Sequence, residues 1–163
     1  MGEVTVRRAV EADEQALLAI ELTAWDASSG FPSMTPADKK TFFSERSGPD
    51  AHLVAEADGE VLGYLRLQDA YSFPEGSGVL SINGLAVATE ARGRGIGSIL
   101  MTAVDDEAKR RGARKVTLHV HGTNTVARRL YERHGYVVEG TRAREFLIEG
   151  QLVDTLDLAK FLT

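Results

Sequence analysis

The stretch that decides the fold is VLSINGLAV-ATEA-RGRGIGS, which runs from Val79 to Ser98. Its first part, Val79–Val87, is rich in apolar and β-branched residues and predicts a strand. The segment Arg92–Ser98 carries three glycines in five residues, and glycine lets the backbone approach a ligand where side chains would obstruct it. An amphipathic helix follows. The turn therefore places backbone N–H groups at a helix N-terminus, which favours an anion.

Two common phosphate-binding patterns do not fit this turn. The dinucleotide pattern G-x-G-x-x-G fails because Gly93 and Gly95 lead to Ser98, and no Gly-Lys-Ser/Thr follows for a P-loop. What remains is R-x-x-G-x-G, from Arg92 to Gly97. Within the preceding strand, Gly84 predicts a bulge or a close approach of another backbone.

The composition sets limits on the class of protein. We expect residues 1–163 to form a single domain, with 43% hydrophobic and 26% charged residues. A net charge of −5 argues against nucleic acid as the main partner and suits a cationic partner such as an amine. The absence of cysteine excludes a cysteine nucleophile. With no membrane-length apolar run and no signal-peptide pattern, we expect a cytoplasmic protein without a membrane partner.

The chain before this stretch predicts one short strand, two helices and a hairpin. Asp13 is the expected N-cap of the first helix, and the second begins with Thr-Pro-Ala-Asp at Thr35. Asp58-Gly59 between alternating runs predicts a tight hairpin turn. In order, the expected elements are a strand Glu3–Arg7, a helix Asp13–Trp25, a helix Thr35–Ser47, and hairpin strands His52–Ala57 and Val61–Gln68.

The chain after this stretch alternates between helix and strand and ends in a hairpin. The helix–strand order after Val79–Val87 predicts a local parallel pair of strands. The expected elements are a helix Gly97–Arg111, a strand Val116–Val120, a helix Asn124–His134, and a closing hairpin of Tyr136–Ile148 and Gln151–Leu158. Together they predict a mixed α/β sheet.

A second motif joins the glycine-rich turn. The segment from Asn124 to Tyr136, NTVARRLYERHGY, resembles N-x-x-A-x-x-L-Y-x-x-x-G-F/Y, and R-x-x-G-x-G precedes it by a helix and a strand. The pair resembles the two signatures of the GNAT superfamily of N-acetyltransferases. The resemblance implies an α+β fold of one domain, with a splayed, mixed, mostly antiparallel sheet and helices on both faces. It also implies acetyl-CoA as cosubstrate and no metal.

The resemblance assigns the cofactor contacts by position. The backbone of Leu85, Ala86 and Val87 would pair with the pantetheine arm. Asn124 would lie beside the pantetheine, although it is equally suited to cap its helix. Tyr131 would sit near the thioester sulfur and protonate the departing thiolate, whereas spacing alone would make it a core aromatic. The pyrophosphate would be held by backbone N–H groups of Arg92, Gly93, Arg94, Gly95, Ile96, Gly97 and Ser98.

The general base is left open. An aliphatic ammonium with a pKa near 10 must lose a proton before it attacks, which at neutral pH costs about 4 kcal/mol. The central strand offers Ser81 and Asn83 and no acid, so His119 and His121, two residues apart on one strand, are the catalytic candidates. Both histidines can equally be bystanders, with the enzyme capturing amine that is already neutral. Glu56, Asp69 and Asp154 are weaker candidates.

The acceptor is not specified by the sequence. Trp25 and Phe31 flank the loop that usually borders the acceptor site in this family, and Asn83 and Asp154 are further candidates for contacting the substrate. A small amine, an amino acid or antibiotic, and a protein amine all remain open, as does an acyl group longer than acetyl. The resemblance also allows a homodimer. The alternative function is a non-catalytic acyl-CoA-binding or sensor module on the same fold.

Overall fold

The computed structural model describes residues 2–162, which form one seven-stranded sheet in the order β1-β2-β3-β4-β5-β7-β6. All neighbouring strands are antiparallel except β4 and β5. The strands are β1 (Thr5–Arg8), β2 (His52–Ala57), β3 (Glu60–Asp69), β4 (Val79–Val87), β5 (Lys115–His121), β6 (Val137–Ile148) and β7 (Gln151–Phe161). The helices are α1 (Glu14–Ala24), α2 (Ile96–Arg110) and α3 (Thr125–Arg133). This is the mixed, mostly antiparallel α+β fold that the sequence predicts.

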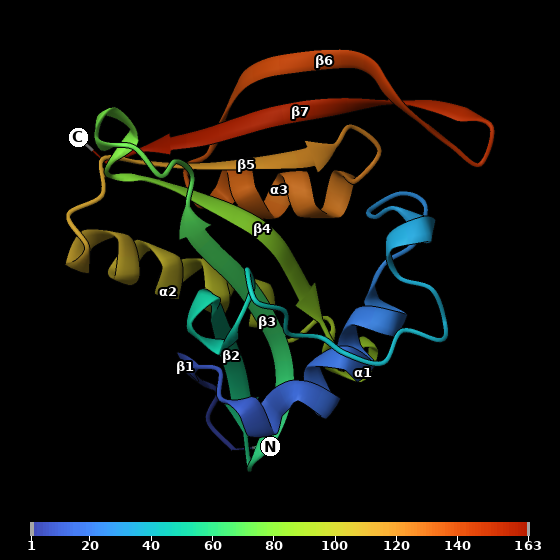
Figure 1. The fold of residues 1–163 in the computed structure, drawn as a ribbon, viewed down its shortest axis with the longest axis vertical. Helices are drawn as coiled ribbons and strands as arrows, with labels where there is room; N and C mark the ends of the chain where they lie inside the picture. Colours follow the sequence, from blue (N-terminus) through green and yellow to red (C-terminus); the bar gives the residue numbers. More distant parts are fainter. Residues whose placement is uncertain (1, 163) are drawn as a thin grey trace.

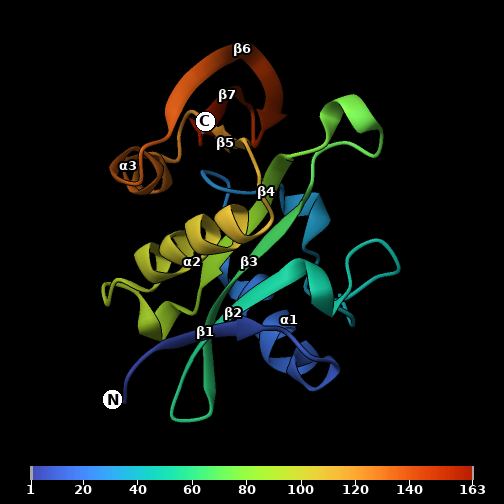
Figure 2. The same cartoon turned by 90° about the vertical axis from the view of Figure 1, so that its left-hand side faces the viewer.

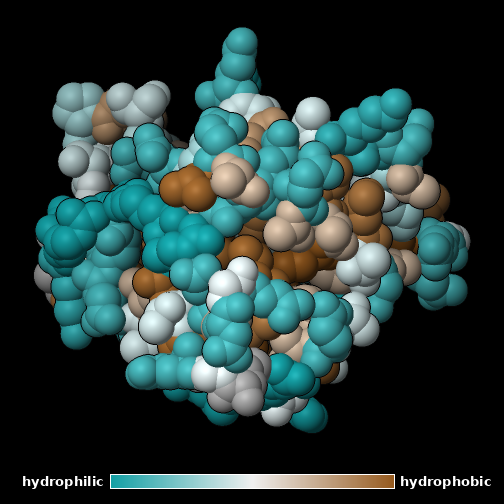
Figure 3. Space-filling model, turned by 90° about the horizontal axis from the view of Figure 1, so that it is seen from below, coloured by the Kyte–Doolittle hydropathy of each residue, from teal (hydrophilic) through white to brown (hydrophobic). Residues whose placement is uncertain are grey.

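The helices cover both faces of the sheet. Figure 2 shows α1 and α2 on opposite sides of β2–β4, with α3 on the same side as α2. Leu17 of α1 and Leu100 and Val104 of α2 are fully buried, so a core forms on each face. Seen from below, apolar side chains reach the surface in a band framed by polar ones (Figure 3). Among the described residues, no helix is both long and apolar enough to cross a membrane.

The sheet is split between β4 and β5. These strands pair only from Val79 opposite Lys115 to Ile82 opposite Leu118, and the later part of β4 diverges from β5 (Figure 1). A bulge lies at the point of divergence. On the β3 side, Leu67 pairs with Ile82 but Leu65 pairs with Leu85, so Asn83 and Gly84 both lie opposite Arg66. Gly84 has a φ of 123°, which confirms the predicted bulge.

The other elements after Val79 agree with the prediction. Helix α2, the parallel strand β5, helix α3 and the β6–β7 hairpin all form within one to three residues of the expected bounds. The β2–β3 turn also forms as expected, with φ values of 53° at Asp58 and 77° at Gly59. These positive angles match a tight hairpin turn.

The predicted helix Thr35–Ser47 is wrong. The chain forms a loop here, between two short 3₁₀ turns, Pro32–Met34 before it and Pro49–Ala51 directly before β2. The Glu14 carboxylate of α1 accepts the backbone N–H groups of Phe42 (3.2 Å) and Phe43 (2.9 Å), which a helix would direct at its own carbonyls. Phe42 is buried, and its ring packs against His52 and Tyr64. Tertiary contacts thus override the local helix signal.

Asp13 also has a different role from the predicted one. It directly precedes α1, but its side chain does not cap the helix. Its carboxylate instead accepts hydrogen bonds from the Arg7 guanidinium (2.8 and 2.9 Å) and from the Val10 N–H (2.8 Å). These hydrogen bonds, the one from Arg7 above all, lower the pKa of Asp13. The side chain therefore fastens β1 to the start of α1.

Candidate functional site

The glycine-rich turn presents free amides at the start of α2. Gly95 is the N-cap with a φ of 75°, a left-handed conformation that favours glycine. The first intrahelical bond runs from the Ile99 N–H to the Gly95 carbonyl (3.0 Å), which leaves the amides of Ile96, Gly97 and Ser98 directed out of the helix end. This is the arrangement that binds an anionic group such as pyrophosphate.

Two side chains of this turn have structural partners. Arg92 donates to the Ala24 carbonyl at the end of α1 (2.9 Å), and the Ser98 hydroxyl bonds to His134 Nε2 at the end of α3 (2.7 Å). The turn is thereby fastened to α1 and α3. Because these side chains are engaged, the backbone amides are the groups that the turn offers to a ligand.

A cavity of about 700 Å³ lies against the split between β4 and β5. Its walls come from α1, the loop between α1 and β2, both separating strands, α3 and β6. It brings together most of the acceptor-side and catalytic residues that the sequence predicts. Those in its lining are Trp25, Phe31, Asn83, Leu85, His119, His121, Asn124 and Tyr131.

Asp154 does not join this group. Along β7, Thr155 lines the cavity, and the neighbouring Asp154 is exposed and accepts the Arg144 N–H (2.8 Å). The structure therefore does not bring Asp154 to the acceptor side. Among the weaker base candidates, Glu56 pairs with Arg7 at the other edge of the sheet (3.0 Å), and Asp69 ends β3 outside the cavity lining.

Tyr131 lies on α3 at the cavity wall. It is 7% exposed, and burial raises its pKa to about 12. Its hydroxyl is therefore protonated at neutral pH and can act as a proton donor. Tyr136 lies next to it, with ring centroids 6.1 Å apart, but is absent from the cavity lining.

Asn124 caps α3 through its side-chain oxygen, which accepts the Ala127 N–H (3.2 Å). Because Asn124 also lines the cavity, this cap leaves the side chain beside the opening between the strands. The structure thus places Asn124 where capping and a cofactor contact are compatible.

The two histidines of β5 have different surroundings. His119 is half exposed, and its Nδ1 bonds to Asp157 Oδ1 across the β5–β7 pair (2.5 Å). His121 is buried, with the Phe31 ring against it at 4.9 Å, and its Nδ1 has no hydrogen-bond partner among residues 2–162. Burial lowers the pKa of His121, so this ring is neutral at pH 7.

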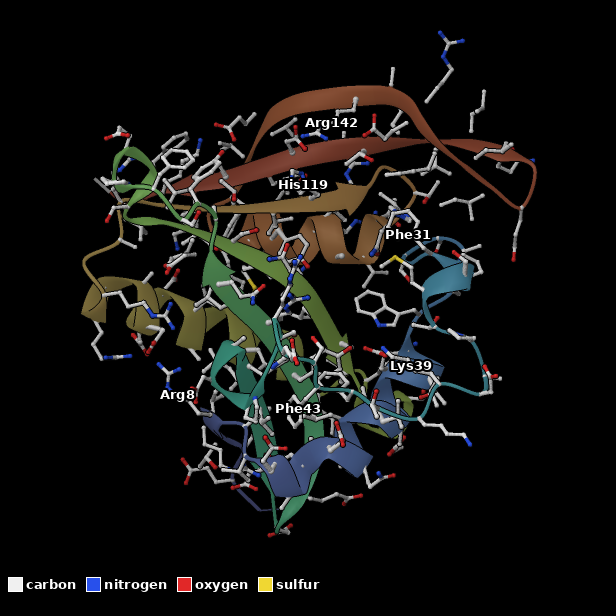
Figure 4. All side chains as sticks on the ribbon, in the orientation of Figure 1. Arg8, Phe31, Lys39, Phe43, His119 and Arg142 are labelled. Atoms are coloured by element: carbon white, nitrogen blue, oxygen red, sulfur yellow. The ribbon has the colours of Figure 1, made fainter. Side chains whose placement is uncertain are left out.

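Several residues in or beside the cavity escaped the sequence analysis. Asp157 also accepts a hydrogen bond from Arg142 Nε of β6 (3.3 Å), and Arg142 pairs with Glu145 (3.5 Å). Lys39 and Glu21 form an ion pair at the opposite wall, near the loop that carries Phe31 (Figure 4). Arg66 of β3 also lines the cavity, and it is the one charged residue between Glu60 and Asp69, the two ends of that strand. That isolated charge is the signal that could have identified it.

The splayed pair of β4 and β5, the free amides at the start of α2 and the cavity lined by Tyr131 are the arrangement that the resemblance to N-acetyltransferases implies. The profile of the Acetyltransferase (GNAT) family matches residues 15–136. The crystal structure of smu.2055 from Streptococcus mutans UA159 superposes with a TM-score of 0.83 at 25% identity, covering 98% of this chain and 99% of that one. The chain therefore belongs to the GNAT family of acetyltransferases.

Two curated relatives differ in how much of their length is matched. The L-amino acid N-acetyltransferase AaaT of Escherichia coli (strain K12) is 27% identical over 163 residues, covering 98% of this chain and 99% of that protein. The mycothiol acetyltransferase of Nocardia farcinica is 33% identical over 137 residues, which are 83% of this chain and 42% of that protein. The chain thus spans less than half of the second relative.

Proposed function

We propose that this protein transfers an acetyl group from acetyl-CoA to a primary amine by direct attack of the amine on the thioester. The observation that carries the proposal is the split between β4 and β5, beside a cavity lined by Tyr131 and Leu85. A Cβ added to Gly97, at the start of α2, would lie 3.9 Å from the Leu85 side chain, so the free amides of α2 begin next to that wall. Within the described residues, β4 pairs with β5 only as far as Ile82, so Leu85–Val87 have no strand partner on that side. The pantetheine arm would pair there.

Two side chains would carry the proton transfers: Tyr131 for the departing thiolate and His119 for the attacking amine. The neutral amine nitrogen bonds to the thioester carbon, the C–S bond breaks, and the thiolate takes a proton from Tyr131, which is restored by the second proton that the nitrogen loses as the amide forms. The proton lost by the ammonium passes through water to His119, which Asp157 orients through the 2.5 Å hydrogen bond. The last pair between β4 and β5 is Ile82 with Leu118, and Asn83 and His119 are the next residues on the two strands. The water relay to His119 would therefore begin at the β4 bulge. The products are an amide and free CoA.

The test is release of the CoA thiol from acetyl-CoA in the presence of pooled primary amines. We expect release that depends on both amine and enzyme. The alternative, a non-catalytic sensor, predicts saturable binding of acetyl-CoA without release above the rate of hydrolysis without amine.

The cofactor turn gives a prediction for binding. Gly95→Val should weaken acetyl-CoA binding at least about tenfold, because a β-branched residue resists the φ of 75° and so displaces the amides of the turn. Gly112→Val is the matched control, since Gly112 has a φ of 68° at the other end of α2 and equally open space around it. Titration calorimetry checks both variants. Equal loss of affinity in the two, or none in a folded Gly95→Val, would contradict the assignment.

A further inference from the structure

Arg66 is placed at the reaction end of the cavity by the register of the sheet. It lies on β3 directly opposite the bulge residues Asn83 and Gly84. Tyr64, two residues away and therefore on the same face of β3, also lines the cavity. The strand around it, VLGYLRLQ from Val61 to Gln68, has no other charge. Arg66 is thus the one cation that this part of the sheet turns toward the cavity.

The Arg66 side chain has no partner in the part of the chain that the structure describes. Across residues 2–162, no hydrogen bond or ion pair reaches its guanidinium, and its Nε is buried without an acceptor. The other cations of the cavity are satisfied, because Lys39 pairs with Glu21 and Arg142 bonds to Asp157 and Glu145. The carboxylates of the cavity wall are therefore already used, and none is directed at Arg66.

An unpartnered guanidinium that is partly removed from water lacks an anion. Burying a charge without a partner is unfavourable, and the planar guanidinium matches a carboxylate through two parallel hydrogen bonds. We propose that Arg66 binds a carboxylate of the acceptor, so that the substrate of the proposed acetyl transfer is a zwitterionic amino acid. This inference rests on the proposed function, because it takes the cavity to be the acceptor site.

The surroundings of Arg66 also indicate which kind of amino acid the cavity would accept. Arg66 and the bulge residues Asn83 and Gly84 lie on paired strands and all line the cavity, so an acceptor whose carboxylate binds Arg66 has its amine in the same cavity. The lining also contains four large aromatic side chains, Trp25, Phe31, Phe43 and Phe146. Phe31 and Phe146 pack edge to face with centroids 4.7 Å apart. An amino acid with an apolar side chain fits this wall, whereas a protein N-terminus has its first carboxyl group tied in a peptide bond.

The experiment compares amines that differ only in the carboxylate. L-Phenylalanine, L-leucine and L-methionine are each tested against the matching decarboxylated amine and the matching carboxamide. CoA release gives kcat/KM, and titration calorimetry measures binding of the amino acid to the CoA-loaded protein. For at least one set we expect kcat/KM for the amino acid to exceed that for its two analogues by about 10- to 100-fold. In Arg66→Gln this ratio should fall toward one because KM for the amino acid rises. Arg66→Lys should keep part of the preference.

Arg110→Gln is the control, because Arg110 lies on α2 outside the cavity lining and should leave the ratio unchanged. Thermal unfolding shows whether the Arg66 variants fold. Release of CoA with no preference for carboxylates, or a preference that survives in folded Arg66→Gln, would overturn the inference and leave the acetyl transfer standing. Arg66-dependent binding of an amino acid without CoA release would support the site and contradict the transfer. Absence of both binding and release for every amino acid would overturn the inference.

Discussion

Tyr131→Phe is expected to lower kcat by about 10²-fold or more while leaving the affinity for acetyl-CoA nearly unchanged. The phenol is buried, and its pKa of about 12 keeps the proton on the oxygen until a thiolate forms beside it. Removal of the hydroxyl keeps the ring and therefore the packing of α3. The measurement is single-turnover release of CoA, which isolates the chemical step from product dissociation.

Tyr136→Phe is the matched control for this prediction. Tyr136 is the neighbouring buried tyrosine, and its hydroxyl has no hydrogen-bond partner in the described structure. Its removal leaves no partner unsatisfied, so kcat and stability should change little. If Tyr131→Phe and Tyr136→Phe behave alike with chemistry rate-limiting, Tyr131 is a packing residue and the thiolate leaves without its help.

His119→Ala is expected to lower kcat/KM at pH 7 by about 10²-fold. The physical reason is that His119 combines access to water with a carboxylate that fixes its ring, the geometry of an oriented base. Asp157→Asn keeps the shape of that partner and removes its charge, so a smaller loss is expected. His121→Ala should instead act on acceptor binding, because His121 packs against Phe31 and has no partner to orient it.

The pH profile separates this relay from capture of neutral amine. Two acceptors of different basicity are compared in the wild type and in both histidine variants. Proton transfer to a histidine predicts a rise of kcat/KM that is the same for both acceptors, whereas capture predicts a rise that shifts with the pKa of the amine. Burial lowers the pKa of His121, so a base there would place the rise below the ordinary histidine value of 6.5. A profile unchanged in His119→Ala would contradict the relay.

Most of the fold is predictable because its signals are local. Alternation, the turn residues Asp58 and Gly59, and the glycines that bound α2 each specify their own segment. The segment Thr35–Ser47 fails for the opposite reason. It has a plausible helix start, but its conformation is decided by Glu14, far away in the sequence, and by the burial of Phe42 among rings from β2 and β3.

The candidate site also contains some residues that local sequence motifs identify and others that only the fold brings together. The amide turn and Tyr131 belong to continuous motifs, so a resemblance finds them. The Asp157 partner of His119 and the position of Arg66 opposite the bulge depend on strand register, which spacing along the chain does not reveal. Asp154 shows the same dependence on register: its charge allows either a substrate contact or a solvated position, and alternation along β7 turns it away from the cavity that Thr155 lines.

The most direct test of the account is the fate of an isotopically labelled acetyl group. The protein is incubated with labelled acetyl-CoA, first alone and then with pooled primary amines that include the amino acids above, and both protein and small molecules are analysed by mass spectrometry. Direct attack predicts that the label moves to an amine nitrogen as an amide, that CoA is released in equal amount, and that the protein carries no label without amine. Label trapped on the protein before amine is added, or acetyl-CoA bound and recovered intact with every amine, would contradict the account.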